Sequence, residues 1–138
     1  MKKLILFLIL TIFVVGVTGC GQLGNDADIW SEAMYTENTE LGTGEKTVLV
    51  EVVAEDKSVV LTIHSDKDTL GDALLEYDLI DGEQGPYGLY VKKVNGITAD
   101  YDINQCYWGF YKNDESMNTG VDATKLENGD SFKIVYTK

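Results

Sequence analysis

The sequence predicts an α+β fold in which one amphipathic helix covers one face of a β-sheet. Most of the chain after residue 46 shows the two-residue alternation of apolar side chains that is typical of strands. A single segment, 68–82, has helical spacing instead. Turn signals such as Asn95-Gly96 separate the strand segments. Residues 47–138 are therefore expected to form the folded domain.

The first residues have the features of a secretion signal. Lys2 and Lys3 precede the apolar run Leu4–Val15, which is shorter than a membrane-spanning helix and matches a signal-peptide core. Small residues then lead directly into Cys20, a pattern that resembles the bacterial lipobox. We predict a lipoprotein signal peptide at residues 1–19, lipidation of Cys20, and an extracytoplasmic protein anchored to the cell membrane. An ordinary signal peptide and a single-span anchor are the alternatives.

The charge balance is strongly acidic. The chain has 11 basic and 23 acidic residues and a formal net charge of −12. Loss of the two signal lysines leaves nine basic residues against 23 acidic ones, a charge of −14. Such a chain repels phosphate backbones, so we expect no nucleic-acid partner and no polybasic membrane patch.

A polar segment separates the predicted lipid anchor from the domain. Residues 20–46 are rich in Gly, Asn, Asp, Glu and Thr, and are expected to form a flexible tether. The apolar stretch Ile29–Tyr35 interrupts this segment. It is interpreted as a short helical turn docked on the domain or on a partner, or as a transient local cluster.

The domain is expected to begin with a hairpin. Two alternating segments, 47–54 and 59–65, flank the tight polar connection 55–58. Their inward positions hold Val48, Val50 and Val52 on the first strand and Val59, Leu61 and Ile63 on the second. His64 falls on the opposite face and is expected to contact solvent.

The helical spacing follows the hairpin. Asp68 or Thr69 is expected to cap a helix of about three turns. Asp72, three residues after Thr69, fits a capping box, and Gly82 is expected to end the helix. The rest returns to strands, so the order is β-β-α-β-β-β-β. One helix crossing an antiparallel or mixed sheet in this order predicts a β-grasp (ubiquitin-like) arrangement.

One strand, within Gln105–Asp114, concentrates aromatic side chains. Alternation places Cys106, Trp108 and Phe110 on the face toward the helix, with the Trp108 indole N–H satisfied near the sheet edge. The other face, with Tyr107, Gly109 and Tyr111, is expected to be exposed. Gly109 indicates either a shallow notch between two rings or a β-bulge.

Catalytic and metal-binding patterns are missing from the sequence. His64 is the only histidine, and Cys106 has no second free cysteine if Cys20 carries lipid. The segment Asp100–Asn104 begins like a calcium loop, but position six is Gln105 and position twelve is Tyr111. We therefore expect no enzyme activity, no metal site and no cofactor.

Three segments together carry a family resemblance: "GLYVKKVNGI", "YWGFYKND" and "GVDATKLENGDSFKIVY". In order and spacing they resemble the bacterial family of unknown function described as transcobalamin-like C-terminal. They also resemble, more distantly, the β-domain of transcobalamin and intrinsic factor. The resemblance spans Thr47–Thr137 and implies a β-grasp fold whose aromatic strand lies beside a corrinoid. We expect the α/α-barrel domain of those carriers to be missing here.

The resemblance and the tyrosine pattern together give the candidate ligand-binding residues: Tyr90, Tyr107, Trp108, Tyr111 and Met117. We expect a membrane-tethered binding module that holds a small molecule, cobalamin or a related corrinoid, for uptake. An uptake transporter or a larger cobalamin-binding protein is the expected partner. The alternative is a protein-interaction or transporter-accessory domain of the cell envelope without its own small-molecule ligand.

Overall fold

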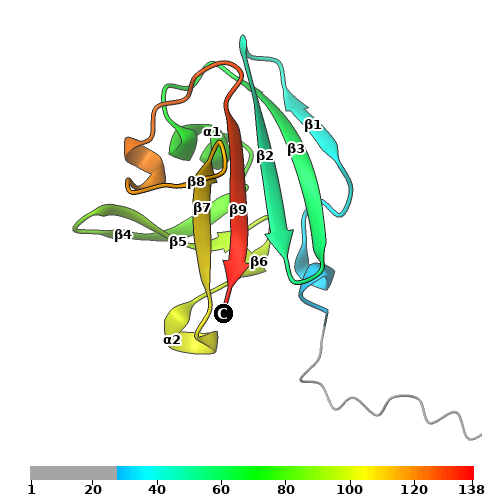
Figure 1. Ribbon diagram of the computed structural model, residues 1–138, viewed down its shortest axis with the longest axis vertical. Coiled ribbons are helices and arrows are strands. Elements are labelled where there is room, and N and C mark those ends of the chain that lie inside the picture. The colour runs from blue at the N-terminus through cyan, green and yellow to red at the C-terminus, as the bar shows by residue number, and fades with distance from the viewer. Residues whose placement is uncertain (1–27) are drawn as a thin grey trace, which may run out of the picture.

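A six-stranded mixed sheet forms one layer of the molecule in the computed structural model, which describes residues 28–138 (Figure 1). The strand order in this sheet is β1-β3-β2-β9-β7-β8. The strands are β1 Thr39–Gly42, β2 Lys46–Ala54, β3 Lys57–Ser65, β7 Tyr107–Lys112, β8 Glu115–Ser116 and β9 Ser131–Thr137.

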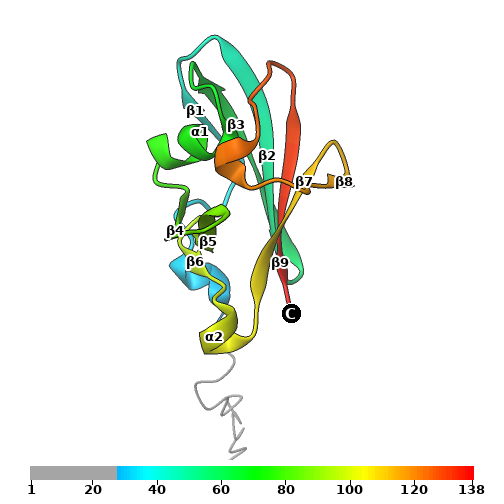
Figure 2. The same ribbon diagram turned by 90° about the vertical axis from the view of Figure 1, so that its left-hand side faces the viewer.

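A second layer lies against one face of this sheet, as the edge-on view in Figure 2 shows. It contains a three-stranded sheet in the order β4-β5-β6 and several short helices. The elements are β4 Ile80–Gly85, β5 Gly88–Val94, β6 Ile97–Thr98, α1 Leu70–Glu76, α2 Tyr101–Asn104 and the 3-10 helices η1 Ile29–Glu32 and η2 Val121–Ala123. The predicted α+β class is confirmed. The described residues form mostly strands, with short helices.

The β2–β3 hairpin forms as the alternation predicts. The two strands pair antiparallel with Val50 opposite Leu61, and Glu55 in the tight turn has a φ of 56°. The last strand, β9, lies between β2 and β7, parallel to β2 and antiparallel to β7. The two ends of the domain sequence therefore meet in the middle of the sheet.

The core fills the space between the two layers. Inward side chains of the large sheet include Val50, Leu61 and Phe132, none more than 1% exposed. The second layer contributes Leu70 and Leu74 from α1, both fully buried. Each such side chain stabilises the fold by about 1.5–3 kcal/mol relative to its exposed state.

The helix α1 is shorter than predicted. Its start is correct, because the Thr69 hydroxyl accepts a hydrogen bond from the Asp72 N–H at 3.2 Å. It ends after two turns instead of three, since Asp78 adopts a φ of 55° and the buried Leu79 leads the chain into β4. Gly82, the predicted helix stop, lies in β4 at an irregularity in the pairing, where a Cβ would lie close to the Tyr90 carbonyl.

The expectation of one sheet with a single helix is also wrong. The segment Ile80–Thr98 forms the separate small sheet, in which the Asn95-Gly96 turn occurs as predicted. The strand that follows this turn, β6, ends at Thr98. Asp100 then caps α2 by accepting a hydrogen bond from the Asp102 N–H at 3.1 Å, so this polar turn is helical.

The described part of the predicted tether is folded, which corrects the boundary at residue 46. Trp30 of η1 is 5% exposed, and its indole N–H donates to the Ala54 carbonyl at 3.0 Å. Of the alternatives for Ile29–Tyr35, the structure has the helical turn docked on the domain. Composition alone missed this because contacts with residues distant in the sequence, among them the Trp30–Ala54 hydrogen bond, order the polar segment. Farther on, β1 pairs parallel with β3.

The predicted signal peptide and Cys20 lie outside the described residues. Within residues 28–138, no helix is long and apolar enough to cross a membrane.

Asn95 clasps the N-terminal segment to the second layer. Its fully buried side chain accepts a hydrogen bond from the Tyr35 N–H at 2.9 Å and donates one to the Tyr35 carbonyl at 2.8 Å. The Asn95 carbonyl accepts from the Met34 N–H at 2.9 Å. Asn95 also has a φ of 52°, a conformation that asparagine tolerates better than most residues.

We expect Asn95→Ala to lower the free energy of unfolding by about 2–4 kcal/mol, because it leaves two backbone groups of Tyr35 without partners and strains the turn. Urea unfolding measures the change. Asn95→Gly removes the same hydrogen bonds without the strain and should cost less. Asn118→Ala, at an exposed position, is the control. Equal stabilities for Asn95→Ala and Asn118→Ala would contradict the clasp.

Candidate functional site

An open cleft of about 340 Å³ lies between β5 and β7, and we call it the aromatic cleft. Three segments form its walls: the middle of β5, the first part of β7, and the connection that leads into η2. Tyr101 of α2 completes the lining. The lining residues are Leu89, Tyr90, Val91, Tyr101, Tyr107, Trp108, Phe110, Thr119, Gly120 and Val121.

Strand alternation and two backbone contacts set the walls. Trp108 and Phe110 point from β7 toward the second layer, and Trp108 is 5% exposed. The Leu89 N–H of β5 donates to an Asp122 carboxylate oxygen at 3.2 Å, which fastens β5 to η2. The Met117 N–H donates to the Phe110 carbonyl at 2.9 Å and brings the connection to the edge of β7.

Three of the five predicted ligand-binding residues line this cleft: Tyr90, Tyr107 and Trp108. Tyr90 and Tyr107 are 48% and 45% exposed, so their rings are accessible. Tyr107 reaches the cleft although alternation predicts that it faces away, because it is the first residue of β7, where the strand leaves α2.

The other two predicted residues lie elsewhere. Tyr111 is on the opposite face of β7, where its ring would be 3.5 Å from a Cβ at Gly109. The expected notch at Gly109 is therefore bordered by this ring, and the pairing of β7 with β9 has no bulge there. Met117 is partly buried and lines a different cleft, beside Lys112 and Thr124.

The remaining lining residues have weaker signals in the sequence. Tyr101 is 59% exposed and is not among the predicted ligand-binding residues. Its place in the cleft depends on α2, which alternation did not predict. Leu89 and Val91 come from a strand whose partner, β4, was also missed.

The Trp108 indole N–H is buried without a hydrogen-bond partner among the described residues. This corrects the expectation of a partner near the sheet edge. The Trp108 ring instead meets Tyr136 edge to face, with ring centroids 5.4 Å apart and an interplanar angle of 76°. An unpartnered buried N–H costs roughly 1–3 kcal/mol. A ligand with a hydrogen-bond acceptor that reached this N–H would recover part of that cost.

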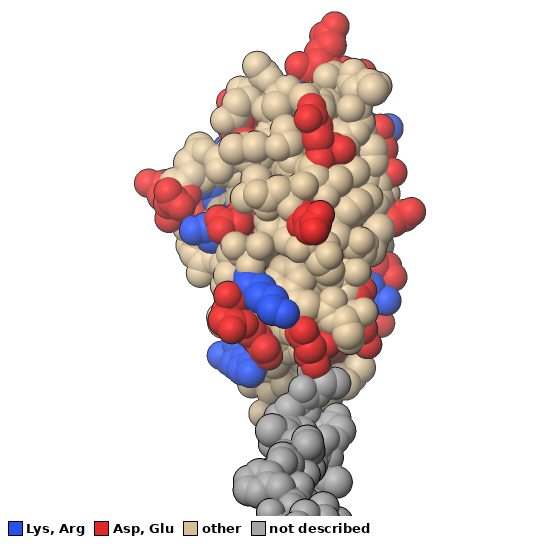
Figure 3. Space-filling model, turned by 90° about the vertical axis from the view of Figure 1, so that its right-hand side faces the viewer, with Lys and Arg blue, Asp and Glu red and all other residues tan. Residues whose placement is uncertain are grey.

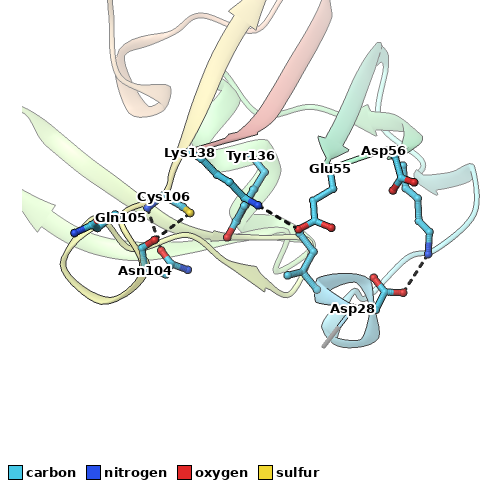
Figure 4. Close-up of a pocket in the computed structure, with 10 residues that line it drawn as sticks. Asp28, Glu55, Asp56, Asn104, Gln105, Cys106, Tyr136 and Lys138 are labelled. Atoms are coloured by element: carbon cyan, nitrogen blue, oxygen red, sulfur yellow. Dashed lines mark hydrogen bonds and ion pairs between the residues drawn. The ribbon is translucent and has the colours of Figure 1, made fainter. Parts of the chain in front are cut away.

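A second, more polar cleft of about 740 Å³ lies at the end of the molecule near α2 (Figure 4). Ion pairs cross its surface, with Lys57 3.1 Å from Asp28 and Lys138 3.7 Å from Glu55. The buried Cys106 thiol donates to the Asn104 carbonyl at 3.2 Å. Cys106 is thus a core residue, as predicted.

Tyr136 lines the same polar cleft and contacts Cys106. Burial of the phenol, and then its hydrogen bond with Cys106, raise the pKa of Tyr136 to about 12. The neutral phenol is therefore favoured in the folded protein.

His64 is half-buried on the outer face of β3. Its ring nitrogens contact the Thr47 hydroxyl at 2.9 Å and the Glu40 carboxylate. These contacts tie β1 to the hairpin. Within residues 28–138, no three His, Cys, Asp or Glu side chains are placed to hold a metal ion. Acidic side chains are spread over the side of the molecule in Figure 3, with few basic ones among them.

The two buried tryptophans form a matched pair for a stability test. Both are 5% exposed, but within residues 28–138 only the Trp30 indole finds a hydrogen-bond acceptor. We expect Trp30→Phe to lower the free energy of unfolding by about 1–3 kcal/mol more than Trp108→Phe, because only the first leaves a carbonyl without its donor. Chemical denaturation measures both. An equal or larger loss at Trp108 would mean that its N–H makes an interaction of comparable strength.

Tyr136 should make stability depend on alkaline pH. A phenol with a folded-state pKa near 12 and an ordinary value of 10 stabilises the fold below pH 10, and this contribution disappears as pH rises through 12. Between these values the wild-type free energy of unfolding should fall more steeply than that of Tyr136→Phe. Tyr87→Phe, at a 97% exposed position, should follow the wild type. Parallel curves for Tyr136→Phe and wild type would refute the assignment.

Comparison with solved structures gives two informative matches. A protein from Ruminococcus gnavus ATCC 29149, described as a "putative metal binding protein", is 36% identical with a TM-score of 0.64. The match covers 68% of this chain and 98% of that one. Haptocorrin in complex with Cbi matches with a TM-score of 0.54 and 16% identity, and therefore shares the fold. That match covers 71% of this chain but 26% of haptocorrin.

No curated protein matches the chain. The family model described as "Domain of unknown function (DUF4430)" matches residues 67–138, which is more than half of the chain. This segment contains η2 and most of the aromatic cleft. Together with the Ruminococcus relative, the match confirms the resemblance of the sequence motifs, and the chain belongs to the DUF4430 family.

Proposed function

We propose that the protein is a membrane-tethered, extracytoplasmic binding module whose aromatic cleft holds one side of a flat organic molecule, with a corrinoid as the leading candidate. The observation that carries this proposal is the convergence of Tyr90, Tyr101 and Tyr107, each about half exposed, on a cleft floored by Trp108. Exposed aromatic rings offer large contact areas with few rotatable bonds, so they bind flat molecules at low entropic cost.

The size and chemistry of the cleft support a small organic ligand. Its volume of about 340 Å³ is at the lower end of the range for ligand sites. Its lining, drawn entirely from described residues, has no carboxylate, histidine or cysteine, which argues against a metal ion there. The metal-binding description of the Ruminococcus relative therefore does not extend to this cleft.

The haptocorrin match makes a corrinoid the first ligand to test. That protein is described in complex with Cbi, and the present chain corresponds to about a quarter of its length. A module of this size would cover one side of a corrinoid, and a larger binding protein or a transporter would cover the other. The strand order β3-β2-β9-β7-β8, with β2 parallel to β9, further supports the β-grasp assignment.

The sequence supports the proposed location. Lipidation at Cys20 would place the module on the outer face of the cell membrane, where uptake systems receive their ligands. Each buried acyl methylene contributes about 0.8 kcal/mol to anchoring. We infer binding without catalysis, because the aromatic cleft has no pair of a nucleophile and a base.

Equilibrium dialysis of the full chain, solubilised in detergent, against cobinamide and cobalamin tests the proposal. We expect saturable binding that Tyr107→Ala weakens by roughly tenfold or more, the loss expected when an exposed aromatic anchor is truncated. Tyr90→Ala should have a smaller effect in the same direction. Tyr87→Ala, at an exposed tyrosine outside the cleft, is the control and should bind like the wild type.

The outcomes separate the two functional hypotheses. Loss of binding in Tyr111→Ala but not in Tyr107→Ala would move the site to the outer face of β7. No binding of either corrinoid would favour the alternative, a protein-interaction or transporter-accessory domain. In every variant, an unchanged thermal unfolding curve must show that the fold is intact.

A further inference from the structure

The most exposed apolar side chains near one end of the molecule belong to α2. Ile103 is 77% exposed and its neighbour Tyr101 is 59% exposed. The helix has only four residues, and hydrogen bonds within the turn define its shape: the Asp100 carboxylate caps it and the Asn104 side chain accepts from the Asp100 N–H at 3.1 Å. Both apolar side chains are therefore presented on a fixed turn.

This end is also where the described chain begins. Asp28 and Asn104 line the same polar cleft, so the start of the described chain and the end of α2 lie on one end of the domain. Figures 1 and 2 both show α2 and the start of η1 at that end, together with the C-terminus of the chain in Figure 1.

The short connection to the predicted anchor restricts how the domain meets the membrane. Cys20 and Asp28 are eight residues apart. Even fully extended, eight residues span at most about 29 Å, at 3.6 Å per residue. The end of the domain that carries Asp28 must therefore remain within that distance of a lipid on Cys20, and the tether gives α2 a high effective concentration at the surface.

We propose that α2 docks on the membrane, with Ile103 in the boundary between headgroups and acyl chains and Tyr101 at headgroup depth. The proposal rests on the lipid anchor of the proposed function. Amphipathic tyrosine rings favour the membrane–water interface, and an exposed isoleucine gains by leaving water.

The charges around α2 indicate which lipid headgroups this surface can bind. Asp28 pairs with Lys57, and Glu55 pairs with Lys138. Asp102 is exposed on α2 and has no ion pair among the described residues, so the docking end gains nothing from anionic headgroups. We expect docking on zwitterionic lipid, driven by apolar contact and by the tether.

Docking would also fix the position of the aromatic cleft relative to the membrane surface. Tyr101 lies both on α2 and in the lining of the cleft. A bound ligand would then lie beside the bilayer surface, within reach of an integral membrane transporter.

Depth-dependent fluorescence quenching tests the docking. The full lipidated chain carrying Ile103→Cys is labelled with an environment-sensitive fluorophore and reconstituted in phosphatidylcholine vesicles that contain nitroxide-labelled lipid. Cys106 is buried, so the unsubstituted chain serves as the labelling blank. Tyr87→Cys, at the tip of the β4–β5 hairpin, is the matched control. We expect lipid quenching to be roughly threefold or more stronger at position 103 than at 87.

Equal, weak quenching at both positions would overturn the docking, as would quenching at position 103 that appears only after a membrane protein is added. Failure of the unsubstituted chain to associate with vesicles would overturn it too, because the anchor would be absent.

Corrinoid dialysis distinguishes failure of the membrane docking from failure of the proposed ligand site in the aromatic cleft. Strong quenching at 103 without corrinoid binding would leave the docking standing and reject the ligand. Binding without quenching would do the reverse.

Discussion

The pairing of β9 with both β2 and β7 is the constraint on which the rest of the structure depends. Strand β2 is near the start of the domain and β9 is at its end, and the two run parallel with Val50 opposite Phe132. This contact closes a long loop of chain, and hydrophobic burial must repay the entropy of that closure. Strand β7, which carries Trp108, joins the hairpin only through β9. The aromatic cleft therefore exists only once the last strand is in place.

The cleft arises from the meeting of two layers that do not pair with each other. Strand β7 belongs to the large sheet and β5 to the small one. Strands in one sheet would lie about 4.8 Å apart and leave no room between them, whereas edges from two layers leave a gap that side chains line. Exposed tyrosine rings, together with an indole N–H that has no partner among residues 28–138, collect at this one gap, and such a collection is typical of a binding surface.

A feature could be predicted from the sequence when the residues that determine it are neighbours along the chain. The β2–β3 hairpin, the Thr69 cap and the Asn95-Gly96 turn depend on neighbouring residues, and all three were predicted correctly. Burial of Trp108 followed from alternation in the same way. The early end of α1 and the formation of the small sheet depend on the core site in which Leu79 is buried. No local sequence pattern specifies that site. Tyr101 was missed as a lining residue because α2 was missed.

The attachment of the N-terminal segment has a mechanical consequence. Trp30 is joined to Ala54 beside the β2–β3 turn, and Tyr35 is joined to Asn95 in the small sheet. Tension on an anchored N-terminus would therefore pass into both layers at once, before it reached β1. The hydrogen bonds of Trp30 and Tyr35 would therefore have to break before the edge strand β1 carried the load.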